Sequence, residues 1–86
     1  MRNKIKSKEE KIMKAIVWSK PACGYCVKAK NLLKNKGIEY EERNIAEGWD
    51  VQDLLKQVPT ARTMPQIWLD DKHVGGYYEL EKALQE

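Results

Sequence analysis

The feature that most constrains the fold is a pair of cysteines, Cys23 and Cys26, which lies between a strand pattern and a helix pattern. The run 12–18 before the pair is short, apolar and partly β-branched, as is typical of a buried strand. After the pair, apolar residues recur at helical spacing from Cys26 to Leu33, and Gly37 supplies a C-terminal stop. The chain is therefore expected to turn from strand to helix at the cysteines, with Cys23 at the helix N-terminus.

This placement predicts redox chemistry. The unpaired backbone N–H groups and the dipole of a helix N-terminus favour an anion. Cysteines in such CxxC sites have pKa values lowered from ~8.5 to roughly 3.5–7.5. Cys23 is therefore expected to be the nucleophilic thiolate of a disulfide exchange reaction. Cys26, one helical turn later, is expected to resolve the mixed disulfide that Cys23 forms.

Structural roles for the cysteine pair are less favoured. A closed zinc site needs four ligands, and the chain offers two cysteines and one histidine, His73. A purely structural disulfide between the two cysteines would close a very small loop and stabilise the fold little. The other conspicuous residues are interpreted as structural, namely Trp18, Trp49, Trp68 and His73.

The remaining patterns extend the strand and helix into a complete α/β unit. A strand that is joined to the first through a helix is expected to run parallel to it. The order β-α-β-α-β-β-α predicts a four-stranded mixed sheet flanked by three helices. The elements expected after the first helix are a strand at 38–43, a helix from the N-cap Asp50 to Pro59, a hairpin of 65–69 and 72–75 that turns at Asp70-Asp71, and a helix through Leu80, Ala83 and Leu84.

Length and composition favour one domain. The 86 residues are 42% hydrophobic and carry a net charge of +3, which does not by itself predict nucleic-acid binding. Residues 1–11 carry five of the sixteen basic residues and are interpreted as a solvated extension, with a docking arm as the alternative, so the folded domain is expected at 12–86. Nothing resembles a signal peptide or a membrane span, so a cytoplasmic location is expected. The protein is also expected to be a monomer.

Several segments in this order resemble a glutaredoxin, a small thiol-disulfide oxidoreductase with the thioredoxin-like fold. The resemblance covers about residues 13–85. It rests on the segments Lys20-Pro21-Ala22-Cys23-Gly24-Tyr25-Cys26, Val51-Gln52-Asp53, Ala61-Arg62-Thr63-Met64-Pro65 and Gly75-Gly76. CxxC after a strand is moderately specific alone, and the Thr-x-Pro and Gly-Gly segments downstream make the pattern strong.

The resemblance implies a binding site for glutathione, which acts as reductant and co-substrate without any bound cofactor. In this interpretation Lys20 lowers the thiol pKa and attracts the glycine carboxylate. The proline of Thr-x-Pro is cis, and the residue before it, Met64, offers its backbone to the glutathione peptide. The residues implied are Lys20, Tyr25, Gln52, Arg62, Thr63, Met64, Pro65, Gly76, Tyr77 and Tyr78.

The chain departs from the family pattern at two places. Tyr78 stands where many glutaredoxins carry the aspartate that recognises the γ-glutamyl amine, and Glu79 is a candidate substitute. Gly24 stands where the best-known dithiol members have proline, which restores a backbone N–H at the helix start. Some glutaredoxins without that proline hold a bridging [2Fe–2S] cluster between two subunits, so Cys23 is also a candidate cluster ligand.

The resemblance therefore predicts a glutathione-dependent oxidoreductase that reduces protein disulfides and glutathione mixed disulfides through Cys23 and Cys26. Ribonucleotide reductase is among the clients that it suggests. Two alternatives remain: a redoxin reduced by thioredoxin reductase, and a carrier of the bridging [2Fe–2S] cluster.

Overall fold

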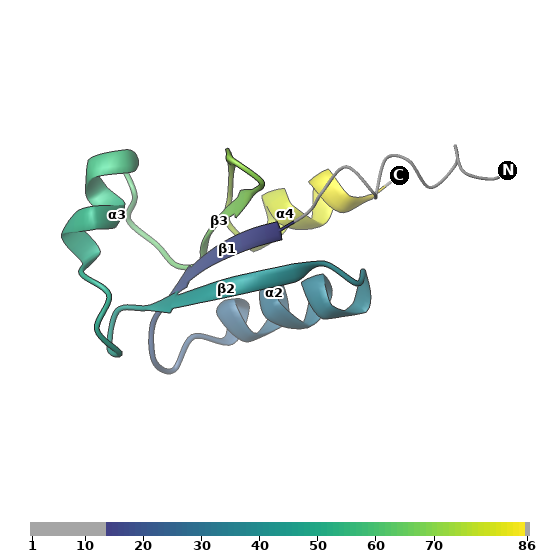
Figure 1. Cartoon of the computed structure of the whole chain (residues 1–86), viewed down its shortest axis with the longest axis horizontal. Helices are drawn as coiled ribbons and strands as arrows, with labels where there is room; N and C mark the ends of the chain where they lie inside the picture. The colour runs from purple at the N-terminus through teal and green to yellow at the C-terminus, as the bar shows by residue number, and fades with distance from the viewer. Residues whose placement is uncertain (1–13, 86) are drawn as a thin grey trace, which may run out of the picture.

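A central four-stranded sheet organises the molecule, with helices packed against both of its faces (Figure 1). The computed structural model describes residues 14–85. The predicted element order β-α-β-α-β-β-α and the three flanking helices are confirmed. In chain order the elements are β1 (Lys14–Ser19), α2 (Gly24–Asn35), β2 (Glu39–Asn44), α3 (Val51–Gln57), β3 (Gln66–Leu69), β4 (Lys72–Gly75) and α4 (Tyr77–Leu84).

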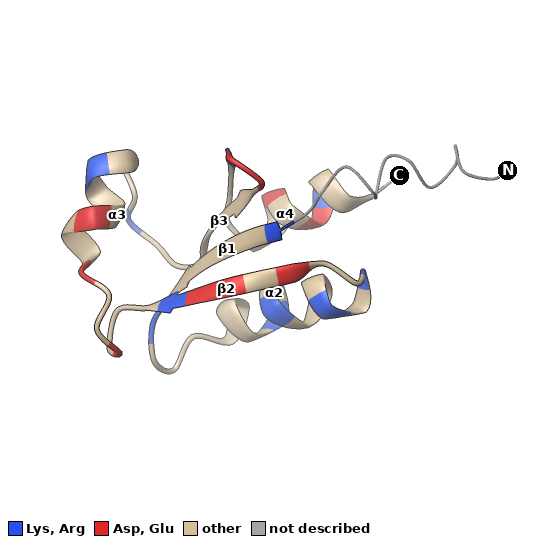
Figure 2. Cartoon of the chain, viewed as in Figure 1, with Lys and Arg blue, Asp and Glu red and all other residues tan. Residues whose placement is uncertain are grey.

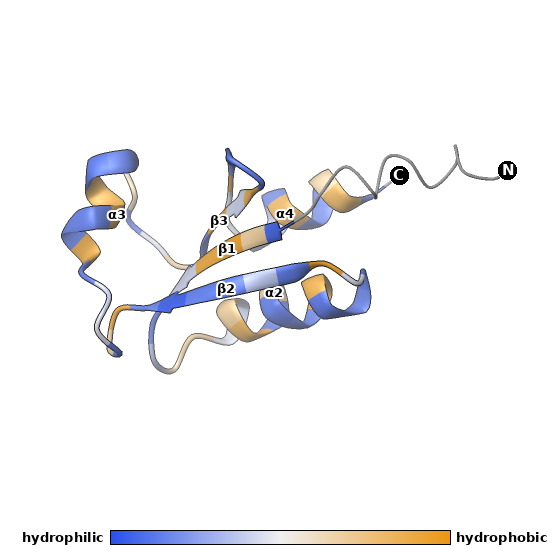
Figure 3. Cartoon of the chain, in the orientation of Figure 1, coloured by the Kyte–Doolittle hydropathy of each residue, from blue (hydrophilic) through white to orange (hydrophobic). Residues whose placement is uncertain are grey.

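The strands lie in the order β2-β1-β3-β4. β1 pairs in parallel with β2, as expected for strands joined through a helix, and antiparallel with β3. β3 and β4 form the predicted hairpin, and Asp70 takes a positive φ of 55° in its turn. The interior strand β1 is mostly hydrophobic and the edge strand β2 mostly hydrophilic (Figure 3).

Alternate residues of β1 supply two separate cores. Ala15 and Val17 are fully buried on one face, together with residues of α2, α4 and β3. On the other face Trp18 packs with Leu54 of α3 and Trp68 of β3, which confirms both tryptophans as core residues. A strand between two such layers has no solvated face, which explains the continuous apolar run in its sequence.

Two backbone devices fix the ends of α2. Cys23 is its N-cap, with extended backbone and a side chain that accepts a hydrogen bond from the N–H of Cys26. At the other end Gly37 has a positive φ of 74°. Its N–H donates to the carbonyl of Lys34, and the N–H of Ile38 donates to the carbonyl of Leu33, which is the Schellman pattern of a helix stop.

Bounds of three strands differ from the sequence prediction by one residue, and one of these is the start of β3, which lies at Gln66 rather than at Pro65. β1 continues to Ser19, and β2 runs from Glu39 to Asn44 rather than over 38–43, because Ser19 and Asn44 pair with each other at the end of the parallel ladder. The predicted start of the first strand at Ile12 and the N-terminal extension lie outside the described residues. Within the described part of the chain, no helix combines the length and the apolar character that crossing a membrane requires.

Candidate active site

The two cysteines lie at the start of α2, in the segment that follows β1, as the sequence predicts. They are joined as a disulfide in this structure. The N–H of Cys26 donates to Cys23 Sγ over 3.2 Å, so the helix N-terminus points a donor at this sulfur. Cys23 is half-buried, whereas Cys26 is only 2% exposed. A substrate sulfur can therefore approach Cys23, while Cys26 is shielded beneath it.

The Thr-x-Pro segment faces Cys23 from the start of β3. The Met64–Pro65 peptide bond is cis, which confirms the expectation from the resemblance. Cys23 Sγ lies 3.8 Å from the carbonyl oxygen of Met64. The buried Gln66 donates to the carbonyl of Thr63 over 2.9 Å and pairs with His73 Nε2 at 2.8 Å, which holds this segment in place.

A groove beside Met64 gathers most of the glutathione-site residues that the resemblance implies. One end of it lies between the N-termini of α2 and α4 and is lined by Tyr25, Thr63, Met64, Pro65, Gly76, Tyr77, Tyr78 and Glu79. Thr63 and Met64 also line an adjoining pocket with Lys20 and Arg62. The structure therefore brings together nine of the ten predicted site residues around one main-chain segment.

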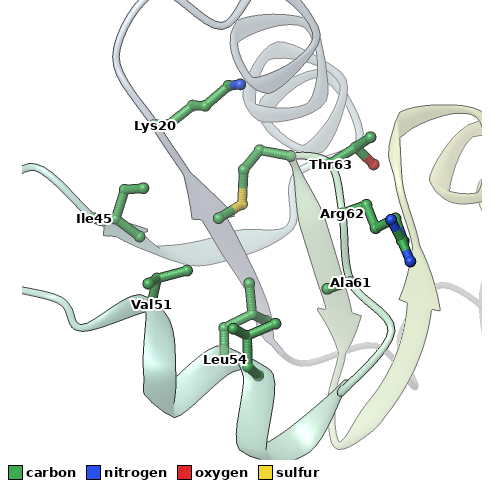
Figure 4. Close-up of a pocket in the computed structure, with 9 residues that line it drawn as sticks. Lys20, Ile45, Val51, Leu54, Ala61, Arg62 and Thr63 are labelled. Atoms are coloured by element: carbon green, nitrogen blue, oxygen red, sulfur yellow. The ribbon is translucent and has the colours of Figure 1, made fainter.

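The adjoining pocket combines an apolar wall with two cations (Figure 4). Ile45, Val51 and Leu54 lie along one side of it, and Lys20 and Arg62 border it elsewhere. Both basic side chains belong to exposed residues, so they remain free to move toward an anion. Their positive charge gives this end of the groove a preference for a carboxylate.

Gln52 is the predicted site residue that does not line this groove in the described chain. It is exposed on the first turn of α3, where its N–H donates to the N-cap carboxylate of Asp50 over 2.9 Å. Asp50 is confirmed as the helix cap, and the role of Gln52 in glutathione binding stays a prediction.

The opposite end of the groove is formed by three tyrosines. The hydroxyls of Tyr25 and Tyr78 lie 3.2 Å apart, and the ring of Tyr77 lies within 6 Å of both other rings at 5.9 and 5.3 Å. The hydrogen bond with Tyr25 raises the pKa of Tyr78, which keeps its phenol neutral. No charge therefore comes from position 78, where the family pattern has a carboxylate.

Glu79 has a local task at the start of α4. Its Oε1 accepts a hydrogen bond from the N–H of Gly76 over 2.9 Å, so this carboxylate caps the helix. Gly75 has a φ of 117°, and a Cβ there would lie 3.0 Å from Glu79 Cγ. If Glu79 replaced the missing aspartate, as the sequence hypothesis has it, one carboxylate would have to cap the helix and also bind the γ-glutamyl ammonium.

Glu42 of β2, which lines a pocket with both cysteines, accepts two hydrogen bonds at one oxygen. Ser19 Oγ donates over 2.7 Å and Lys30 Nζ over 2.9 Å. These bonds, that of Lys30 first, hold the pKa of Glu42 below its ordinary value of 4.5. Glu42 is thus a carboxylate at neutral pH, and it fixes the ammonium of Lys30.

The lowered pKa of Glu42 predicts a pH dependence of folding. Because the unfolded chain binds a proton at Glu42 more readily than the folded chain, the pair stabilises the fold above the ordinary pKa, and this contribution is lost as the pH falls through the lowered folded value. When urea unfolding is measured from about pH 7 to about pH 3, the free energy of unfolding should therefore fall less in Glu42→Gln than in wild type. Equal acid slopes in the two proteins would contradict this.

The described residues contain no group of three or more His, Cys, Asp or Glu side chains that is suited to a metal ion. A bridging cluster of the kind considered above would take one thiolate from each of two chains, so the geometry of a single chain does not test it. The cluster hypothesis stays a prediction, checked by anaerobic reconstitution followed by absorption and a glutathione-dependent dimer.

Sequence reasoning did not single out Ser19, Lys30, Glu42 or Gln66. Lys30 follows Cys26 by four residues, which is a signal for one helix face. Glu42 and Ser19 meet only because β1 and β2 pair in parallel, with Val17 opposite Glu42. That register is not visible in the sequence alone.

Comparison with known proteins gives the family. A family model described as glutaredoxin matches residues 15–74. A glutaredoxin of Haemophilus influenzae is 37% identical over 81 residues, which are 86% of this chain and 93% of that protein. The reduced glutaredoxin of Escherichia coli aligns with a TM-score of 0.69 and 34% identity over 81% of this chain and 91% of its own.

A buckwheat glutaredoxin–glutathione complex aligns with a TM-score of 0.70 and 26% identity, over 91% of this chain and 76% of its own. The thioredoxin-like fold expected from the sequence is thereby confirmed. Since the matched region runs from β1 through the cysteine pair to the hairpin, the chain belongs to the glutaredoxin family and is a thiol-disulfide oxidoreductase.

Proposed function

We propose that this protein uses glutathione to reduce protein disulfides and glutathione mixed disulfides through Cys23 and Cys26. The observation that carries the proposal is the position of Cys23. It is the accessible sulfur of the pair, it accepts a helix N-terminal N–H, and it lies 3.8 Å from the Met64 carbonyl in the wall of the groove. A thiolate at this place is stabilised by the helix and lies beside main chain that lines the groove.

The reaction begins from the reduced pair. The Cys23 thiolate attacks the glutathione sulfur of a mixed disulfide, a bond forms between these two sulfurs, and the client sulfur leaves as a thiolate that takes a proton from water. A second glutathione thiolate then attacks the glutathione sulfur on Cys23. This releases oxidised glutathione, made from the client's glutathionyl group and the incoming glutathione, and restores the Cys23 thiolate, so each cycle consumes one free glutathione and reduces one mixed disulfide.

Protein disulfides need the second cysteine. After Cys23 has formed a mixed disulfide with the client, the Cys26 thiolate attacks Cys23 Sγ and expels the client thiolate, leaving the Cys23–Cys26 disulfide. The structure corresponds to this oxidised product. Two glutathione molecules then reduce the pair and leave as oxidised glutathione.

The charges around the groove support glutathione as the reductant. Lys20 and Arg62 border the pocket at one end, where a glycine carboxylate would meet positive charge. Met64 lies between the two ends, with its main chain next to Cys23. The relative from buckwheat binds glutathione, as its complex states. We propose that the protein acts as a cytoplasmic monomer. Its proposed clients are disulfide-containing proteins such as ribonucleotide reductase.

The tyrosine end of the groove predicts weak recognition of the γ-glutamyl ammonium. Tyr78 is a neutral phenol that bonds with Tyr25, so Tyr78→Asp would restore a negative charge facing the ammonium. We expect this substitution to lower KM for a glutathionylated peptide by about threefold, the scale of an exposed charge pair. Tyr78→Phe is the matched control, because it breaks the bond to Tyr25 without adding charge. An unchanged KM in Tyr78→Asp would contradict this account.

The test of the proposed function is the choice of reductant. Reduction of a glutathionylated peptide by the wild-type protein should proceed with glutathione and glutathione reductase. It should not proceed with NADPH and thioredoxin reductase alone. Turnover with thioredoxin reductase and none with glutathione would overturn the proposal in favour of a redoxin of the other kind.

A further inference from the structure

A second pocket adjoins the cysteine pair and shares Lys20 with the glutathione groove. Both cysteines line it, together with Lys30 of α2 and Glu42 of β2. Neither Lys30 nor Glu42 lines the groove described above. The reaction as proposed gives these two charged residues no task, although they share a pocket with both reacting sulfurs.

Lys30 is held toward the cysteines by its helix and by its partner. It follows Cys26 by four residues, so the two side chains lie on one face of α2. Helical side chains lean toward the N-terminus, so the stem of Lys30 runs back over the turn that contains Cys26. Its ammonium is 2.9 Å from Glu42 Oε2, and its side chain is 23% exposed. The cation is therefore fixed in place and partly shielded from water.

Cys26 is the group that needs such a cation. It is 2% exposed, so its sulfur is largely removed from water, and withdrawal from water disfavours a charged group. The resolving step requires its thiolate. The titratable and charged groups that line the pocket around it are Cys23 at the helix cap, Lys20 from the loop after β1, Lys30 from α2 and Glu42 from β2. The carboxylate of Glu42 has the opposite effect on a thiolate, and it is engaged by hydrogen bonds from Ser19 and Lys30. Lys20 and Lys30 are therefore the groups in this pocket whose charge favours the thiolate form of Cys26.

We propose that Lys30, anchored by Glu42 and Ser19, is a positioning residue that promotes ionisation of Cys26 and so speeds the resolving step. The inference rests on the proposed two-cysteine function. In this step Cys26 gives its proton to water, and its thiolate forms a bond with Cys23 Sγ. The bond between Cys23 and the client sulfur breaks, and the client thiolate leaves with the electron pair. The opposite charges on α2 and β2 that support this arrangement are visible in Figure 2.

The step can be isolated by mixing the reduced protein with neutral dipyridyl disulfide in a stopped-flow instrument. Attack by Cys23 releases the first thiopyridone at a rate that depends on probe concentration. Attack by Cys26 on the resulting mixed disulfide releases the second thiopyridone at a rate that does not. A neutral probe is used because its own attraction to lysine is small.

Lys30→Met should lower the ratio of the second rate to the first by about threefold at neutral pH. The expected value assumes that the thiol pKa rises by roughly one unit. The fraction of Cys26 present as thiolate then falls about tenfold, while the nucleophilicity of that thiolate rises about threefold. For the same reason the pH midpoint of the second phase should move upward, and at high pH the Lys30→Met rate should reach or exceed that of wild type. Lys30→Arg, which keeps the charge, should restore the wild-type midpoint.

Lys34→Met is the matched control, since Lys34 is an exposed lysine on the same helix and should leave both the ratio and the midpoint as in wild type. An unchanged midpoint in Lys30→Met, or an equal change in Lys34→Met, would overturn the inference while leaving the two-cysteine function intact. Loss of the second phase in the wild-type protein would instead overturn the two-cysteine function on which the inference rests.

Discussion

Replacing Cys23 by serine should abolish turnover, and replacing Cys26 by serine should not. A serine hydroxyl is not ionised near neutral pH, so Cys23→Ser should reduce activity on a glutathionylated peptide by roughly three orders of magnitude or more. Cys26→Ser should keep this activity, because glutathione itself can release the adduct from Cys23. The same variant should lose the reduction of an intramolecular protein disulfide, for which the second sulfur of the pair is needed.

The different burial of the two sulfurs is the physical reason for this asymmetry. Cys23 is half-buried and receives the helix N–H, whereas Cys26 is 2% exposed and is not open to a protein substrate. Both variants should be assayed with glutathione reductase on the glutathionylated peptide and on a protein disulfide. Mass spectrometry of Cys26→Ser should find glutathione attached at Cys23. Turnover retained in Cys23→Ser would show that Cys23 is not the attacking sulfur.

Much of the fold follows from local patterns in the sequence. Asp50 and Gly37 are a helix cap and a helix stop that need no tertiary contact to be recognised, and both act as predicted. The hairpin turn at Asp70 was also visible, although its residues favour the turn less than an Asp-Gly pair does. The boundaries of β1 and β2 were less accessible, because the pairing of Ser19 with Asn44 depends on the register between two strands.

The site divides in the same way. The cysteines are recognisable because a strand, a CxxC pair and a helix follow one another in the chain. By contrast, the bond between Tyr25 and Tyr78 joins the starts of two helices that are far apart in sequence. The capping contact of Glu79 with Gly76 is local, yet the family comparison drew attention to ligand recognition at that position instead. Side chains that meet through the sheet, such as Lys30 and Glu42, required the structure.

The largest effect on stability is expected where the helix that carries the cysteines enters the core. Leu33 of α2 is fully buried among residues of β1, β3 and α4. Leu33→Ala removes apolar contacts and leaves a cavity, and we expect a loss of about 2–5 kcal/mol in the free energy of unfolding. For a domain of this size that corresponds to a fall in Tm of roughly 10 °C or more. Urea and thermal unfolding of the oxidised protein would measure both quantities.

Leu32→Ala is the matched control, because it removes the same atoms from the neighbouring position, where the side chain is only partly buried at the edge of the same core. Its cost should be clearly smaller, since less apolar surface is withdrawn from water and solvent can fill the space left behind. Leu33 lies nearly two helical turns beyond Cys26, so the folded Leu33→Ala protein should keep its activity at low temperature. Equal losses of stability in the two variants would mean that α2 is held by its caps rather than by this core, and the placement of the cysteines would then depend chiefly on Cys23 and Gly37.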